Sequence, residues 1–143
     1  MNLSPWSMFN PQDWSINDVY DHAAFVYLIT FPDSGEYYIG IKQVYKGIKD
    51  ARNITPDSTQ SNWVTYVSSS TTVKEYIENG ETYNKQILWC FKTLQEALQV
   101  ETALIALHGS ELNCLNKAIM VKTKIKKSRS TIGVIREILG WLV

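Results

Sequence analysis

Residues 25–42 read FVYLITFPDSGEYYIGIK, two runs of β-branched and aromatic residues separated by a proline–glycine turn. Such runs favour strands, and a short turn of this kind between them indicates an antiparallel hairpin. We therefore predict strands over residues 25–30 and 36–42. Pairing these strands would bring Tyr27 and Tyr38 close together on the predicted sheet.

A helix is predicted over residues 94–108, because the sequence TLQE at 93–96 is a capping signal and Gly109 is a stop signal. One face of this helix carries Glu101 among apolar side chains, namely Leu94, Leu98 and Ile105. A carboxylate in such a face costs free energy unless it meets a metal, a cation or water. Two interpretations stay open: Glu101 lies at the edge of the face and reaches water, or it faces a cleft over the sheet.

Three further segments have clear local signals. A helix over residues 72–79 follows serine and threonine hydroxyls, a third strand is predicted at 84–91, and an amphipathic helix at 131–143. The resulting β-β-α-β-α order predicts an α+β domain with a small three-stranded antiparallel sheet flanked by helices and a basic C-terminal extension.

The chain is divided accordingly into three parts. Residues 1–22 are expected to form an irregular arm anchored by Trp6 and Trp14, residues 23–118 the domain, and residues 119–143 a basic strand or arm followed by the short helix. That helix is expected to pack on the domain or to form a dimer contact. Both are favoured over a membrane surface, because the polar face of the helix is thin.

Charge is distributed unevenly along a chain that is neutral overall, with 14 basic and 14 acidic residues. Residues 1–40 contain no lysine or arginine, whereas the C-terminal stretch is basic. This asymmetry favours a polyanionic partner, and the basic run includes Lys122, Lys124, Lys126, Lys127 and Arg129.

Cellular location is inferred from the cysteines and the N-terminus. The two cysteines lack a disulfide or zinc spacing, and the N-terminal residues lack the pattern of a signal peptide. No apolar run is long enough to cross a bilayer. A reducing cytoplasm, with no membrane association, is therefore expected.

Several side chains have the chemistry needed to cleave a phosphodiester bond. A phenol can position a water molecule, a carboxylate such as Glu101 can hold Mg²⁺, and cations can bind phosphate. The structural alternatives are ordinary core tyrosines and a solvated basic loop. The candidate phosphate-binding cations after the hairpin are Lys42, Lys46, Lys49 and Arg52, and Tyr66 adds an aromatic hydroxyl.

At these residues the chain resembles the GIY-YIG nuclease superfamily. The motifs Phe25-Val26-Tyr27 and Tyr38-Ile39-Gly40 resemble its signature, and the segments ending at Glu101 and Asn116 resemble its glutamate helix and later asparagine. Residues 63–70 also resemble a segment of phage-encoded stand-alone homing endonucleases.

The resemblance implies DNA cleavage with one Mg²⁺ or Mn²⁺ ion on Glu101. It implies that Tyr27 orients or activates the attacking water and that Tyr38 assists while contacting the phosphate. Asn116 would orient a neighbouring group or the backbone near the site. Apart from the resemblance, the alternating basic run with Lys124, Lys126 and Lys127 can track a DNA backbone, and a solvated surface strand is the alternative.

Two positions depart from the family pattern. Phe25 replaces the first glycine, and Ile48 stands where the family usually has its catalytic arginine. Lys42 is the preferred substitute, with Lys46, Lys49 and Arg52 as other candidates, although lysine lacks the bidentate geometry of arginine.

Three functions follow, in order of preference. The first is a nicking endonuclease of homing type, phage-encoded and acting in the host cytoplasm, alone or as a homodimer. The second is a nuclease-derived nucleic-acid-binding or regulatory module that no longer cleaves. The third is an interaction factor that docks on a host protein.

Overall fold

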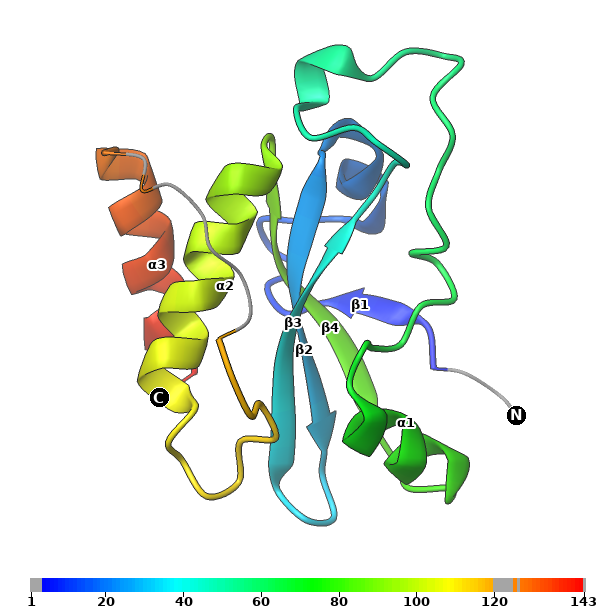
Figure 1. Ribbon diagram of the computed structural model, residues 1–143, viewed down its shortest axis with the longest axis vertical. Coiled ribbons are helices and arrows are strands. Elements are labelled where there is room, and N and C mark those ends of the chain that lie inside the picture. Colours follow the sequence, from blue (N-terminus) through cyan, green and yellow to red (C-terminus); the bar gives the residue numbers. More distant parts are fainter. Residues whose placement is uncertain (1–3, 120–124, 126, 143) are drawn as a thin grey trace.

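The computed structural model describes residues 4–119, 125 and 127–142, which form a sheet with helices on both sides (Figure 1). In the described residues the strands are β1 (Trp6–Met8), β2 (Ala24–Phe31), β3 (Glu36–Gln43) and β4 (Asn84–Phe91). The helices are α1 (Thr71–Glu78), α2 (Leu94–His108) and α3 (Arg129–Trp141), with 3-10 turns η1 (Ile16–Asp21) and η2 (Ala51–Asn53).

The sheet of the described residues is mixed and has the strand order β1-β4-β2-β3. β2 lies between β3 and β4 and is antiparallel to both, whereas β1 is parallel to β4. The α+β class is confirmed, but the prediction of three antiparallel strands is wrong by one strand. Residues 6–8 were expected in an irregular arm, and a three-residue strand is too short to show a period of two in the sequence.

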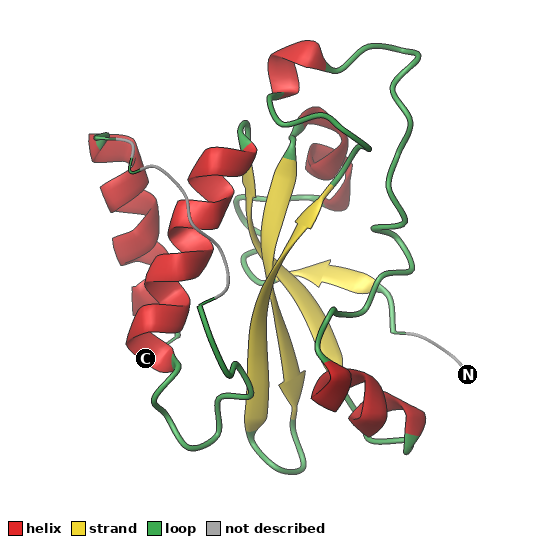
Figure 2. Cartoon of the chain, in the orientation of Figure 1, coloured by secondary structure: helices red, strands yellow, loops and turns green. Residues whose placement is uncertain are grey.

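Alternating residues of β2 point to opposite faces of the sheet, and each face has its own core. Phe25, Tyr27 and Ile29 face α1 and the long connection that precedes it. Ala24, Val26 and Leu28 face the layer formed by α2 and α3 (Figure 1). The connection between β3 and α1 is mostly loop (Figure 2), and its backbone polar groups are paired both within the connection, as in Lys46 N–H to the Thr59 carbonyl at 2.8 Å, and with side chains from other elements.

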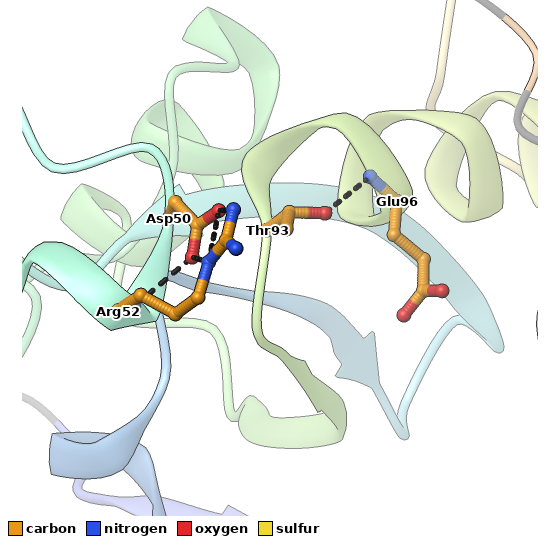
Figure 3. A network of polar contacts seen from close by, with 4 residues as sticks. All are labelled: Asp50, Arg52, Thr93 and Glu96. Atoms are coloured by element: carbon orange, nitrogen blue, oxygen red, sulfur yellow. Dashed lines mark hydrogen bonds and ion pairs between the residues drawn. The ribbon is translucent and has the colours of Figure 1, made fainter.

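The cap of α2 follows from the predicted signal. The Thr93 hydroxyl oxygen accepts a hydrogen bond from the Glu96 backbone N–H at 3.2 Å (Figure 3). The buried face of the helix is centred on Ala97, Val100 and Leu104 rather than on Leu98 and Glu101, whereas Ile105 is buried as predicted. Glu101 therefore lies beside the apolar face, where a half-buried carboxylate is tolerated.

Helix α3 packs on the same core as α2. Ile138 is fully buried, and the Thr131 hydroxyl donates a hydrogen bond to Glu96 Oε2 at 2.7 Å. Trp141 stacks on Phe9 from the N-terminal part of the chain. The expected packing of this helix on the domain is thus observed.

No helix in the described ranges is both long and apolar enough to span a bilayer.

Candidate active site

Tyr27 lies almost fully buried across the hairpin from Gly40. The two residues are register partners on β2 and β3, and Tyr27 is 1% exposed. A Cβ atom on Gly40 would stand 2.2 Å from Tyr27 Cζ and 2.3 Å from its hydroxyl oxygen. The tyrosine ring therefore lies directly on the glycine backbone, and a residue without a side chain is required at position 40.

Tyr38 lies two residues before Gly40 and shares its face of β3, so the two phenols are neighbours. Their ring centroids are 6.3 Å apart. The buried Ser68 hydroxyl lies close to both phenols, and its hydrogen bonding lowers the pKa of each without offsetting burial.

Both phenols are held in the neutral form by the protein. Burial is the main cause that raises the pKa of Tyr27 well above its ordinary value, and Tyr66 and Tyr38 add to the effect. Burial also raises the pKa of Tyr38; hydrogen bonding with Ser69 opposes this, and the charge of Glu101 adds to it. Depression of a phenol pKa, which a metal and a basic group can cause, is not produced by the chain itself.

Glu101 reaches the same place from α2. Helix α2 covers the other face of the sheet, but β3 is the edge strand, so a side chain of α2 can approach Tyr38 around this edge. The charge of the Glu101 carboxylate accordingly raises the pKa of Tyr38. Burial raises the pKa of Glu101 to about 7. Among the described residues, no hydrogen bond or ion pair reaches this carboxylate.

These features fit a divalent cation at Glu101. The described ranges contain no cluster of three or more His, Cys, Asp or Glu side chains placed to hold a metal. One carboxylate suffices for Mg²⁺, which commonly keeps water and substrate phosphate as its other ligands. Because no cation of the described residues pairs with the half-buried Glu101 carboxylate, a bound Mg²⁺ would supply positive charge that offsets the cost of burying it.

Lys42 joins this group through Tyr66. Its Nζ atom lies 4.0 Å from the centroid of the Tyr66 ring, and burial lowers the pKa of this lysine. The Tyr66 ring in turn meets that of Tyr27, with centroids 6.2 Å apart. Lys42, Tyr38 and Gly40 share one face of β3, so the preferred substitute for the family arginine lies beside the phenols.

The other predicted cations lie outside this group. Lys46 and Lys49 are exposed, and Arg52 Nη2 pairs with Asp50 Oδ2 at 2.8 Å (Figure 3). Lys127 is exposed just before α3. Lys124 and Lys126, like Lys122, lie outside the described residues.

Asn116 is hydrogen-bonded to the backbone of the edge strand β3. Its side-chain oxygen accepts from the Ile39 N–H at 2.9 Å, and its amide donates to the Ile39 carbonyl at 2.8 Å. These two hydrogen bonds resemble the pairing between neighbouring strands and fix the backbone between Tyr38 and Gly40.

Two residues close to the site were missed from the sequence. The sequence indicates Ser68 as one of the hydroxyls before a helix and as part of the 63–70 segment, but not that it is 2% exposed and faces the phenols. Lys85 was read as an ordinary strand residue, although it is 1% exposed. One sequence signal could have indicated the burial of Lys85: it lies two residues before Ile87, and alternate residues of a strand point to the same face of the sheet.

The chain forms an α+β domain in which two phenols, a carboxylate and a lysine gather at the edge of the hairpin. The chain belongs to the GIY-YIG nuclease superfamily: the family model described as "Putative endonuclease segE, GIY-YIG domain" matches residues 6–128. The match begins inside the predicted arm of residues 1–22 and extends beyond residue 118. No curated protein and no solved structure matches the chain.

Proposed function

We propose that this protein is a metal-dependent DNA endonuclease of homing type that nicks one strand at a time. The observation that carries the proposal is the half-buried Glu101 carboxylate, which pairs with no cation of the described residues and acts on the Tyr38 phenol. A single such site cuts one strand per event, so a double-strand break would require two copies of the chain. Phage-encoded action in a host cytoplasm belongs to the same proposal.

Each side chain of the group has a distinct role in the proposed reaction. Glu101 would hold one Mg²⁺ or Mn²⁺ ion, which when bound polarises the scissile phosphate and shields the leaving oxygen. The neutral Tyr38 hydroxyl donates a hydrogen bond to a phosphate oxygen or to the attacking water. Tyr27, fixed against Gly40, orients that water.

Lys42 takes the place of the arginine in this proposal. Ile48, which stands where the family arginine is usual, packs against the apolar core and offers no charge. A lysine next to the phenols can balance charge that develops on the phosphate. Lys46, Lys49, Arg52 and Lys127 are left to bind backbone phosphates at a distance from the chemistry.

Lys42→Met is expected to lower the single-turnover nicking rate by about 10²-fold, because the substitution removes a cation beside the transferring phosphate. Lys46→Met is the matched control, since Lys46 follows the same strand but is exposed. The control should keep its rate at low salt within about threefold and lose only some affinity for DNA. Equal losses in the two variants would contradict a role for Lys42 in the reaction.

The pH dependence of cleavage follows from Glu101. Its pKa of about 7 means that protons compete with the metal below neutral pH, so the rate at limiting Mg²⁺ should rise with pH and level off above about pH 7. A tenfold higher Mg²⁺ concentration should move the midpoint down by up to about one pH unit. A rate that is flat, or that falls as pH rises from about 5.5 to 7, is inconsistent with a Glu101-bound ion.

The proposed function is tested by incubating the purified protein with supercoiled plasmid and with a structured RNA. Conversion of the plasmid to the open circle in Mg²⁺ or Mn²⁺, abolished by EDTA and absent on RNA, is the expected result. Gel retardation is run in parallel at low and moderate salt. Binding without cleavage would favour the nuclease-derived binding module, and neither activity would favour an interaction factor.

A further inference from the structure

Lys85 is a buried lysine that the proposed reaction does not use directly. It lies on β4, is 1% exposed, and has Trp6 of β1 and Ile29 of β2 as its register partners. Its Nζ atom donates a hydrogen bond to the Tyr66 carbonyl at 2.9 Å and lies 4.5 Å from the centroid of the Trp6 ring. A lysine in such a place carries a desolvation cost, and burial lowers its pKa to about 8.

The segment that Lys85 contacts has no regular structure of its own. Residues 63–68 lie in the loop before α1, and side chains of the sheet hold two of their carbonyl groups. Trp6 Nε1 donates to the Trp63 carbonyl at 2.7 Å, and Lys85 donates to that of Tyr66. The sheet is therefore tied to the loop at the residue whose ring lies against Tyr27 and under Lys42.

We infer that Lys85 is a positioning residue: it holds the Tyr66–Ser68 segment in place so that Tyr66 and Ser68 keep the phenols and Lys42 in their working arrangement. This inference rests on the proposed function, because it assigns Lys85 to the same site. A lysine suits the position because its long stem packs in the apolar layer while its ammonium reaches the loop. A neutral side chain of the same length, such as methionine, would leave the Tyr66 carbonyl without this donor.

Lys85→Met removes the donor and keeps the length and shape of the side chain. Lys92→Met is the matched control, because Lys92 also donates to a backbone carbonyl, that of Asp21 at 2.9 Å, from an exposed position. Amide hydrogen exchange of residues 63–70 and single-turnover nicking are measured in both variants. We expect exchange in this segment to be at least about tenfold faster in Lys85→Met, with protection of β2 and β4 unchanged.

The kinetic expectation separates positioning from binding. In Lys85→Met the nicking rate at saturating DNA should fall at least about tenfold, with the half-saturating DNA concentration changed by less than about threefold. Lys92→Met should leave exchange in residues 63–70 and the nicking rate unchanged. Unchanged exchange in this segment of folded Lys85→Met overturns the inference.

Two further outcomes are separable. If the wild type does not cleave DNA, the proposed function fails, and hydrogen exchange alone decides whether Lys85 holds the segment. If Lys85→Met does not fold, the wild type is used: the Tyr66 carbonyl carbon resonance should shift as Lys85 titrates between about pH 7 and pH 9. Lys85 is faced by the side chains of Trp6 and Ile29 and by the backbone carbonyl of Tyr66. A carbonyl resonance that stays fixed over this range overturns the contact.

Discussion

Replacing Glu101 by glutamine is expected to abolish metal-dependent cleavage and, at the same time, to make the protein more stable at pH 8. The folded protein raises the pKa of this carboxyl to about 7, from an ordinary value of 4.5. Protonation therefore favours the folded state. The resulting stability is full below about pH 4.5 and is lost as the pH rises through about 7.

Glutamine fills the same space but cannot ionise, so it avoids the cost of burying a charge at pH 8. The expected gain in free energy of unfolding is on the order of 2 kcal/mol at about pH 8 and close to zero at about pH 4.5. Urea denaturation at the two pH values measures the gain directly. Cleavage should fall by at least about 10²-fold, because the amide cannot replace the carboxylate as a metal ligand.

Glu111→Gln is the control for this prediction. Glu111 is exposed, and its pairing with His108 lowers the pKa of the carboxyl, which is the opposite direction from Glu101. The control should therefore not become more stable at pH 8, and its cleavage should be unchanged. A loss of stability in Glu101→Gln at pH 8 would contradict the account of the buried carboxylate, whereas retained cleavage would contradict its role as a metal ligand.

Gly40→Ala should have the second largest effect. The new methyl group would lie 2.2 Å from Tyr27 Cζ, far inside contact distance, so the tyrosine ring must move or the hairpin must open. Overpacking of this kind costs about 1–3 kcal/mol of stability. Because the displaced ring is the one expected to orient water, the nicking rate should fall by about 10²-fold as well.

Gly133→Ala tests whether the effect is specific to the site. A Cβ on Gly133, in α3, would meet no atom within 4 Å, so alanine there should stabilise the helix by about 0.5–1 kcal/mol. Thermal unfolding and single-turnover nicking are measured for both variants. If Gly40→Ala unfolds at the wild-type temperature and cleaves at the wild-type rate, Tyr27 does not pack on Gly40 as described.

The elements with strong local signals were predictable from the sequence. Residues 84–91 and 94–108 were predicted with the bounds that β4 and α2 have in the structure, because a dense apolar run and clear capping residues mark them. The β2–β3 hairpin was also predicted. Its strands begin and end within one residue of the predicted bounds. The spacing of Tyr27 and Tyr38 on this hairpin then led to the pair of adjacent phenols.

Features that depend on tertiary contacts were not predictable in the same way. β1 is three residues long and exists because Trp6 and Met8 are buried against β4, which a local pattern does not reveal. Arg52 forms an ion pair with Asp50, two residues earlier. Its charge alone had made it a candidate for binding phosphate. Lys85 is covered by Trp6 of β1 and by the 63–68 loop, both distant in the sequence, so its local context gives only a weak signal of burial.

The role of Glu101 is tested most simply by plasmid nicking with the wild type and Glu101→Gln side by side, in Mg²⁺ and in EDTA. We expect open circles from the wild type in Mg²⁺ alone, and supercoiled plasmid in all other lanes, while the variant remains folded. Open circles formed equally by both proteins in Mg²⁺ would contradict the metal-binding role of Glu101, because cleavage would then not depend on its carboxylate.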